Sequence, residues 1–129
     1  MNTQAINLLN RLKNASLSNN ELISVPYSKF ILDILLILYK EGFIQSFSVV
    51  EGDSFKKEIS IYLRYYFNKS SLRKLKIVSS PSRVTHLDYN SLSKISIKRN
   101  VLFLSTNLGL LTAIECKRKK IGGILLFIC

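Results

Sequence analysis

The hydrophobic positions up to residue 26 predict a helix followed by a short strand. Apolar side chains recur every three or four residues after Thr3, which can cap the helix, and Asn19 and Asn20 end the pattern. The apolar stripe consists of Ile6, Leu8, Leu9, Leu12 and Ala15. The segment "ELISV" then predicts a strand that Pro26 stops.

A second helix is predicted to begin after Ser28, a favourable cap, and to end just before Gly42. Its inward side chains are expected to be Phe30, Ile31, Ile34, Leu35 and Leu38. Because this helix is apolar over most of its circumference, we expect it to be buried between a sheet and another layer.

Alternating side chains next predict two strands, "QSFSVV" and "EISIYLRYYF", joined in a hairpin around Gly52 and Asp53. One face of the second strand is expected to carry Ile59, Ile61, Leu63, Tyr65 and Phe67, and the other Ser60, Tyr62, Arg64 and Tyr66. Residues 1–67 are thus predicted to form an N-terminal lobe of order α-β-α-β-β. The polar segment "NKSS", residues 68–71, is the expected boundary.

Residues 68–129 change to short strands and turns, and we expect a β-rich C-terminal lobe. "LKIVSS" runs into a turn at Pro81, "SKISIK" alternates basic and apolar side chains, and "VLFLST" is a continuous buried strand. Gly109 turns the chain into the strand "LLT", "AIECKRKK" offers one or two helical turns, and "ILLFIC" closes the sheet. The fold class is therefore predicted as α+β, with two small lobes.

The charge of the chain is concentrated in its second half. The 129 residues carry a formal net charge of +11, yet residues 1–60 are neutral overall. Beyond residue 60, thirteen basic residues face only two acidic ones, Asp88 and Glu115. Such asymmetry indicates a polyanionic partner, either nucleic acid or an anionic membrane, held mainly by the C-terminal part.

Catalysis has little support in the sequence. The single histidine, His86, has no carboxylate pair or cysteine at a useful spacing, and no phosphate-binding glycine loop occurs. Cys116 and Cys129 give neither a metal-ligand spacing nor a disulfide framework, so we expect reduced thiols. We predict no enzyme, no cofactor and no small-molecule substrate; a small hydrolase or RNA-modifying enzyme that uses His86 is the alternative in this class.

Membrane insertion is not predicted either. The longest apolar run, "FILDILLILY", is about half the length of a span and contains Asp33. Residues 2–20 lack the charged region and cleavage site of a secretory signal. A basic protein of the membrane surface remains as an alternative, and it would need an amphipathic helix with cations beside an apolar face.

Nucleic-acid binding has better support. Lys117, Arg118 and Lys119, with Lys120, can meet several phosphates at once, although a solvated helix face would have the same composition. The triplet Ser105, Thr106 and Asn107 ends a buried strand, and hydroxyl and amide groups held there can bond to base edges and 2′-hydroxyls.

Further candidates lie on either side of this region. Gly109, Gly122 and Gly123 permit positive φ or a close approach to a ligand, and ordinary turns would explain each one equally well. Arg11, Lys13 and Asn14 lie largely off the apolar stripe of the first helix, and Arg83 follows the rigid turn at Pro81.

Taken in order, several stretches resemble the small-subunit ribosomal protein S8 family, a primary binder of small-subunit rRNA. The N-terminal stretches are "LLNRLKNA", "VPYSK" and "ILYKEGFI", the middle one is "VSSPSRV", and the C-terminal ones are "STNLGLLT" and "IGG". Their order and spacing hold from about Ile6 to Cys129.

The resemblance implies an α-β-α-β-β lobe, residues 1–67, and a β-rich lobe, residues 68–129, that carries the main contacts to the central domain of the rRNA. It also implies that neighbouring small-subunit proteins are partners. The contact residues implied are Ser105, Thr106 and Asn107 as the family's Ser-Thr-Ser loop, Gly122 and Gly123 beside the same RNA, Arg11, Lys13 and Asn14 on the first helix, and Lys29 at the start of the second.

The chain departs from the family pattern at five positions: Ser82 for Gly, Asn107 for Ser, Leu108 for a cation, Lys120 for Gly, and Ile124 for Glu. Alanine occurs only three times while Ile, Asn, Lys and Tyr are abundant, a bias expected of an AT-rich genome. We therefore expect a gene kept in a mitochondrion; a plastid or a bacterial cytoplasm is the alternative.

Overall fold

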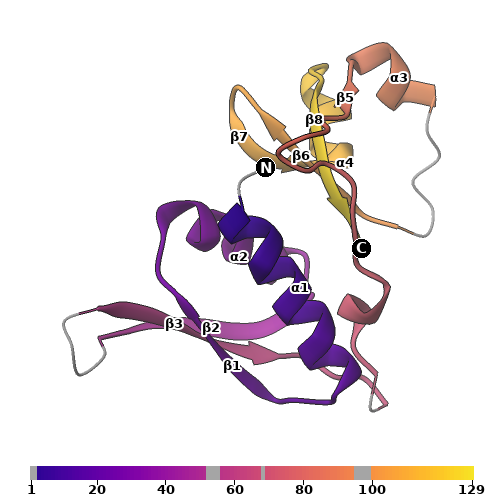
Figure 1. Cartoon of the computed structure of the whole chain (residues 1–129). Coiled ribbons are helices and arrows are strands. Elements are labelled where there is room, and N and C mark those ends of the chain that lie inside the picture. Colours follow the sequence, from indigo (N-terminus) through magenta and orange to yellow (C-terminus); the bar gives the residue numbers. More distant parts are fainter. Residues whose placement is uncertain (1–2, 52–55, 68, 95–99) are drawn as a thin grey trace. The chain divides into compact units, whose positions relative to one another are not determined.

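The chain divides into two compact units. The computed structural model describes residues 3–51, 56–67, 69–94 and 100–129. One unit, the N-terminal unit, comprises Asn7–Lys74; the other, the C-terminal unit, comprises Leu75–Cys129 with the start of the first helix up to Ile6. Figure 1 labels the elements of both units.

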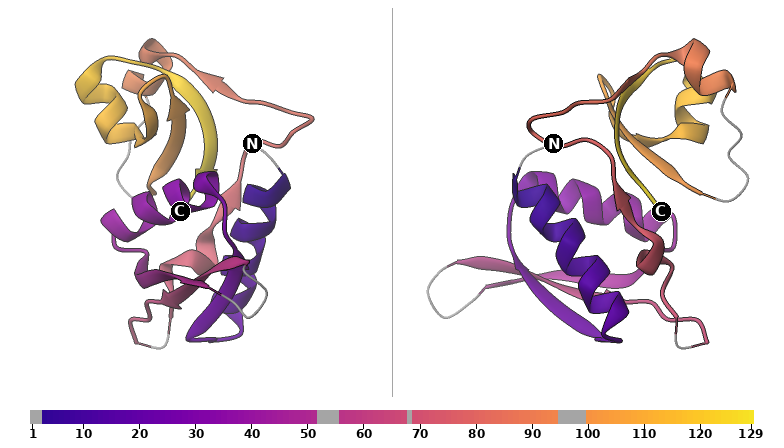
Figure 2. Two further views of the ribbon diagram at one scale, coloured as in Figure 1. Left: turned by 90° about the vertical axis from the view of Figure 1, so that its left-hand side faces the viewer. Right: turned by 45° about the vertical axis from the view of Figure 1, so that its right-hand side comes forward.

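The N-terminal unit is an antiparallel sheet with two helices on one face (Figures 1 and 2). Its elements are α1 (Thr3–Leu17), β1 (Leu22–Pro26), α2 (Lys29–Lys40), β2 (Ile44–Glu51) and β3 (Lys57–Leu63), with β3 between β1 and β2. The predicted order α-β-α-β-β is confirmed. The hairpin turn expected at Gly52 and Asp53 lies outside the described residues.

The core of this unit joins the inward stripes of both helices to the buried face of β3. Its fully buried side chains include Leu8, Leu9, Leu12, Ile34, Leu35, Leu38, Ile59 and Ile61. Burial of each such side chain contributes roughly 1.5–3 kcal/mol. The Ser28 hydroxyl caps α2 by accepting a hydrogen bond from the Ile31 N–H at 3.2 Å, and Gly42 follows the helix with φ 82°.

Helix α2 is not buried on all sides, so that expectation was wrong. Leu36 and Tyr39 are 50% and 53% exposed, and Phe30 is half-buried. A sheet covers one side of a helix only, and in this unit the opposite side of α2 keeps its apolar side chains near solvent.

The strand expected to run to Phe67 ends at Leu63. Tyr65 still turns inward, where its hydroxyl lies within hydrogen-bond distance of the carbonyl oxygens of Ala15 and Asn20. Phe67 lies beyond the strand and is 87% exposed with φ 52°, so its expected place on one face with Ile59 and Ile61 was wrong. The main chains of Tyr66 and Lys69 exchange two hydrogen bonds, and this tight turn takes the chain away from the sheet.

The C-terminal unit is built around a five-stranded antiparallel sheet. Its elements are β4 (Lys76–Ile77), β5 (His86–Leu87), α3 (Tyr89–Lys94), β6 (Leu102–Thr106), β7 (Gly109–Thr112), α4 (Ala113–Lys119) and β8 (Gly123–Ile128); a short 3₁₀ helix, Ser71–Lys74, precedes it in the other unit. The strand order is β4-β8-β6-β7, and β5 also pairs with β8. With helices and antiparallel sheets in both units, the α+β class is confirmed.

The core of the C-terminal unit lies between one face of this sheet and its two helices. It consists of Leu92, Leu102, Leu104, Leu111, Ala113, Cys116 and Leu125. On the other face, the rings of Phe103 and Phe127 stack with centroids 4.5 Å apart. A bulge in β8 lets Phe127 face Phe103 while Leu125 pairs with Leu104.

The strand expected over "SKISIK" begins as a helix. Ser93 and Lys94 are the last residues of α3, and residues 95–99 lie outside the described part. Asp88 explains the helix, because its carboxylate accepts a hydrogen bond from the Ser91 N–H at 2.8 Å. The hydrogen bonds that Asp88 accepts from Ser91, side chain first and then main chain, lower the pKa of this exposed carboxyl.

Candidate nucleic-acid interface

The Ser105–Thr106–Asn107 triplet forms one side of a tight hairpin between β6 and β7. Ser105 pairs with Leu110 and Thr106 with Gly109, so Asn107 and Leu108 occupy the turn and are exposed. Gly109 has φ 109°, a left-handed conformation that favours glycine. The expected turn at Gly109 is therefore present, and its backbone requires this residue type.

The three polar side chains of the triplet have different tasks. The Thr106 hydroxyl donates to the Gly109 carbonyl oxygen at 2.8 Å and accepts from the Leu108 N–H at 3.2 Å, so it braces the hairpin. Only one of its lone pairs remains for a ligand. Within the described residues the Ser105 hydroxyl has no hydrogen-bond partner, and Asn107 is exposed. Ser105 and Asn107 therefore have the greater capacity to bond to a ligand.

The diglycine packs against the protein's own backbone. A Cβ atom on Gly123 would lie 2.5 Å from the Ser105 carbonyl oxygen and 2.8 Å from the Thr106 side chain. A Cβ atom on Gly122 would lie 2.5 Å from the Leu87 carbonyl oxygen. Both glycines allow β8 to approach its neighbours closely, and Gly123 in this way supports the triplet from behind.

The basic cluster occupies the last turn of α4. Thr112 begins this helix by accepting a hydrogen bond from the Glu115 N–H at 3.4 Å. Ala113 and Cys116 face the core, which leaves Arg118 and Lys119 exposed and Lys117 half-buried. Cations in a last turn interact favourably with the partial negative charge of the helix C-terminus.

Lys120 ends α4 in an unusual conformation for a lysine. It has φ 56° and ψ 44°, in the left-handed region. The Ile121 N–H donates to the Cys116 carbonyl at 3.1 Å and the Lys120 N–H to the Lys117 carbonyl at 3.3 Å, the bonding pattern of a Schellman motif. Glycine usually fills this position. With lysine here the cluster has a fourth cation, and the backbone of Lys120 is strained.

Arg83 is exposed at the end of a hydrogen-bonded turn that contains Pro81 and Ser82. The main chains of Ser80 and Arg83 exchange hydrogen bonds of 2.8 and 3.2 Å. Ser82 does not have positive φ, so a glycine is not needed there. Buried Ser79 fastens the turn, because its hydroxyl donates to the Leu125 carbonyl and accepts from the Thr85 N–H at 3.1 Å.

The remaining expected contact residues lie in the N-terminal unit. Arg11 and Asn14 are exposed on one face of α1, one turn apart, whereas Lys13 is half-buried on another side. Lys29 is exposed at the first position of α2. The hairpin, the diglycine, the cluster and Arg83 therefore lie in the C-terminal unit. The N-terminal unit contains Arg11, Lys13, Asn14 and Lys29.

One histidine and two cysteines are the remaining candidates for chemistry. His86 is exposed in β5, paired with Ile124. Burial raises the pKa of the Cys129 thiol to about 12 and also raises that of Cys116, and both are free thiols. In the described part of the chain no group of His, Cys, Asp or Glu side chains could hold a metal ion. None of the helices described there is long and apolar enough to cross a bilayer.

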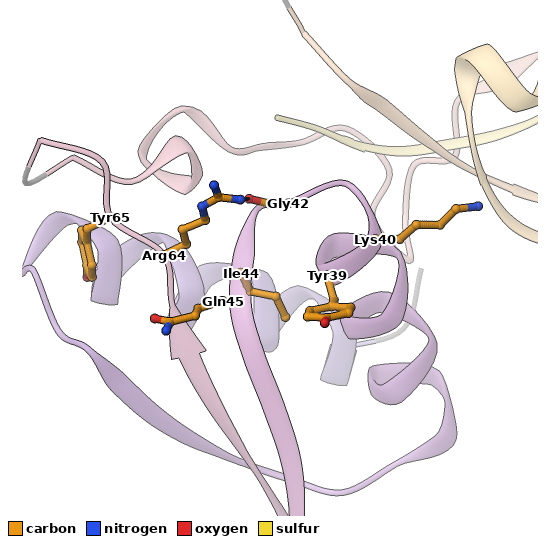
Figure 3. Close-up of a pocket in the computed structure, with 7 residues that line it drawn as sticks. All are labelled: Tyr39, Lys40, Gly42, Ile44, Gln45, Arg64 and Tyr65. Carbon is orange, nitrogen blue, oxygen red and sulfur yellow. Dashed lines mark hydrogen bonds between the residues drawn. The ribbon is translucent and has the colours of Figure 1, made fainter.

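Sequence reasoning missed the structural hydroxyls and one surface. The roles of Ser79 and Thr106 depend on partners that only the folded sheet brings near them. A shallow depression in the N-terminal unit was also missed; it is lined by Tyr39, Lys40, Gly42, Ile44, Gln45, Arg64 and Tyr65 (Figure 3). The cations among its lining residues are Lys40 and Arg64, and no sequence pattern connects these two positions.

Comparison with known proteins identifies the family of the chain. The family model for ribosomal protein S8 matches residues 4–129. Small ribosomal subunit protein uS8 of Mesomycoplasma hyopneumoniae is 39% identical over 120 residues, covering 90% of this chain and 87% of that protein. The uS8 proteins of Rhizobium rhizogenes and Ruthia magnifica are 30% and 31% identical, covering 90% and 95% of this chain and 88% and 93% of their own lengths. The chain therefore belongs to the ribosomal protein S8 family, whose members are structural, rRNA-binding proteins of the small ribosomal subunit.

Proposed function

We propose that this chain binds the central domain of small-subunit rRNA through the β6–β7 hairpin and the α4 cations, and supports rRNA folding during subunit assembly. The observation that carries the proposal is the close contact of Gly123 with Ser105 and Thr106. It fixes the hairpin against the sheet, and a rigidly held group loses little conformational freedom when it binds. Residues 68–129, which comprise the last part of the N-terminal unit and the whole of Leu75–Cys129, are proposed to carry the main rRNA contacts.

The hairpin is proposed to read an irregular part of the RNA. The Ser105 hydroxyl can donate one hydrogen bond and accept two, and the Asn107 amide can donate and accept. Such groups suit base edges and 2′-hydroxyls in unpaired or bulged RNA, where the bases are accessible. Thr106 contributes mainly by holding the hairpin in shape.

The cations are proposed to supply affinity without sequence preference. Residues 75–129 contain nine basic and two acidic residues, so this unit attracts a polyanion as a whole. Lys117, Arg118 and Lys119 would meet phosphates next to the RNA site, with Lys120 and Arg83 adding to the same field. Each phosphate contact releases counterions, which makes binding sensitive to salt.

A second set of contacts is proposed for the N-terminal unit. Arg11 and Asn14 share a face of α1 and can reach RNA together, with Lys13 on the side of the same helix. Lys29 is electrostatically unfavourable at a helix N-terminus, where partial positive charge accumulates. A bound phosphate would be attracted by both Lys29 and the helix N-terminus and would offset the repulsion between them. This supports Lys29 as an rRNA contact.

Some contacts of the family are proposed to have passed to neighbouring small-subunit proteins. Leu108, at the tip of the hairpin, is 63% exposed where a cation is common, and Ile124 replaces an acidic residue. An exposed leucine cannot neutralise a phosphate, but it can pack against a protein. We propose rRNA and ribosomal proteins as the partners. The proposal includes no small-molecule substrate, cofactor or reaction.

The proposed location is a mitochondrial ribosome in the matrix. The scarcity of alanine and abundance of Ile, Asn, Lys and Tyr support a gene in an AT-rich organellar genome. The relatives named above are bacterial, and a bacterial cytoplasm or a plastid fits the same composition. Sequencing the genome around the gene decides between these sources.

Paired substitutions test the proposal. Ser105→Ala should weaken binding to the central-domain rRNA helix by about 1–3 kcal/mol and leave binding to a generic duplex unchanged. Arg118→Ala should weaken both complexes alike and lower the salt slope by about 1. Ser93→Ala, at an exposed position in the same unit, serves as the control. Equal effects of Ser105→Ala on both RNAs would contradict the role given to the hairpin.

A further inference from the structure

The segment after β3 carries an exposed surface that the contacts proposed above do not use. We call it the aromatic turn, and it consists of Arg64, Tyr66, Phe67 and Lys69 in the N-terminal unit. Tyr66 is 71% and Phe67 87% exposed, the two most exposed large apolar side chains among the described residues. Arg64 and Lys69 are exposed on either side of them.

Two main-chain hydrogen bonds close the aromatic turn. The Tyr66 N–H donates to the Lys69 carbonyl at 2.8 Å, and the Lys69 N–H donates to the Tyr66 carbonyl at 3.1 Å. The two rings meet edge to face, with centroids 4.7 Å apart and planes at 86°. Phe67 has φ 52°, a conformation in which a bulky residue is rare and strained, and such strain is concentrated at functional sites.

Arg64 connects this turn to the depression in Figure 3. Its guanidinium group lies over the loop after α2 and donates from Nη1 to the Gly42 carbonyl at 3.4 Å. Tyr39 and Gln45 line the same depression, and a second shallow hollow joins Arg64 to Tyr66 and Lys69. The two hollows share Gly42 and Arg64, so the Tyr39 and Tyr66 rings lie along one continuous surface with Arg64.

The charge around the aromatic turn favours a polyanion over a protein. Within the N-terminal unit, no acidic residue follows Glu58 in the sequence, while the stretch up to Lys74 holds Arg64, Lys69, Arg73 and Lys74. The nearest acidic residues are Glu21, which acts on Tyr65, and Glu41, which precedes Gly42. An ordinary protein surface would offer cations and anions in similar numbers, whereas RNA presents phosphates and stacking bases together. In single-stranded RNA, phosphates can pair with Arg64 and Lys69, and bases can stack on the two rings.

We propose that the aromatic turn binds an unpaired stretch of RNA, with a base stacked on Phe67 or Tyr66 and phosphates neutralised by Arg64 and Lys69. This inference rests on the proposed function as an rRNA-binding protein and adds a second, separate binding surface in the N-terminal unit. Stacking on an aromatic side chain tolerates any base, so the surface selects unpaired RNA rather than a particular sequence.

A tryptophan reporter tests the stacking directly, since the chain contains no tryptophan. The full-length Phe67→Trp protein would be titrated with a short single-stranded oligouridine, and with heparin as a polyanion without bases. We expect saturable quenching of the indole fluorescence by the oligouridine and little by heparin. Absence of quenching, or the same quenching by heparin, would overturn the proposal.

Alanine substitutions give the matching affinities. Phe67→Ala should bind oligouridine roughly 5- to 150-fold more weakly, the equivalent of about 1–3 kcal/mol for one stacked base. Tyr62→Ala, an exposed aromatic on β3 outside the turn, should change nothing. Unchanged RNA affinity of Phe67→Ala, together with its loss from reconstituted small subunits, would assign the surface to a protein partner and overturn the inference.

The same experiments separate this inference from the proposed function. Preference of the chain for the central-domain rRNA helix, without quenching of the reporter, would sink the inference alone. Quenching by oligouridine without that preference would instead sink the role proposed for the β6–β7 hairpin and leave the aromatic turn as the RNA-binding surface.

Discussion

Gly123 lies so close to Ser105 that a Cβ atom on the glycine would be 2.5 Å from the Ser105 carbonyl oxygen. The two residues are on adjacent strands, β8 and β6, whose ladder pairs Ser105 with Ile124. The triplet is thus positioned by main-chain packing as well as by its own turn. This contact links a glycine without functional groups to the proposed RNA-reading hydroxyl.

Gly123→Ala should therefore displace the triplet. The added methyl group must move β6 or β8, at a cost of about 1–3 kcal/mol in unfolding free energy, the usual range for overpacking. Preference for the central-domain rRNA helix should fall with it. Gly122→Ala is the matched control, because its Cβ would meet the Leu87 carbonyl oxygen at the same 2.5 Å on the other side of β8. Equal loss of RNA preference in both variants would indicate a general effect of instability.

Thr106→Val should lower stability more than it lowers RNA affinity. The substitution removes the hydroxyl that bonds to the Gly109 carbonyl and the Leu108 N–H, each worth about 1 kcal/mol when partly exposed. Thermal unfolding and RNA binding would be measured beside Ser105→Ala, for which we expect unchanged stability and weaker recognition. A larger loss of recognition in Thr106→Val, measured well below its unfolding temperature, would contradict this division of roles.

Lys120→Gly should stabilise the protein and weaken RNA binding at once. Glycine adopts φ 56° without strain, so the free energy of unfolding should rise by about 0.5–1 kcal/mol. Loss of one cation should lower the slope of affinity against salt by at most about 1. Lys119→Gly, at the last residue of α4, where φ is not positive, is the contrasting variant and should destabilise the helix by up to about 1 kcal/mol. The same sign of stability change in both variants would argue against a left-handed Lys120.

Stability should decline at alkaline pH because of Cys129. Burial raises the pKa of its thiol from 9.0 to about 12, so above pH 9 the unfolded state loses a proton that the folded state keeps. The contribution of the buried thiol to the free energy of unfolding is fully present below pH 9. It falls by up to about 1.4 kcal/mol per pH unit towards pH 12. Burial also raises the pKa values of Cys116 and Tyr65, which act in the same direction. Urea unfolding of Cys129→Val from pH 8 to 11 should show a shallower decline, and an unchanged slope would speak against the buried thiol.

The sequence predicted the elements whose signal is local. The apolar period of α1, the Ser28 cap, and the run "VLFLST" each depend on neighbouring residues, and all three are confirmed. Phe67 shows where the pattern failed, because alternation continued past Leu63 while the turn at Tyr66 and Lys69 took the chain out of the sheet. Alternation records which side chains could share a face, and hydrogen bonding of the backbone decides where a strand ends.

The candidate site could be predicted only in outline. Residue types indicated the triplet, the cations and the glycines, but Gly123 acts through a strand that lies eighteen positions away in sequence from Ser105. The different roles of Ser105 and Thr106 depend on which of the two hydroxyls donates to the Gly109 carbonyl. No sequence pattern shows which one does. Long-range contacts of this kind appear only after folding.

The most direct test of the central claim is the salt dependence of binding by the unmodified chain. Its affinity for the central-domain helix of its own small-subunit rRNA would be compared, from low to high salt, with that for a generic duplex of equal length. We predict a preference for the rRNA helix that persists as salt rises, because hydrogen bonds from the hairpin are not screened as phosphate contacts are. Equal affinities that fall together would contradict the claim and leave only the cations of α4 as the source of binding.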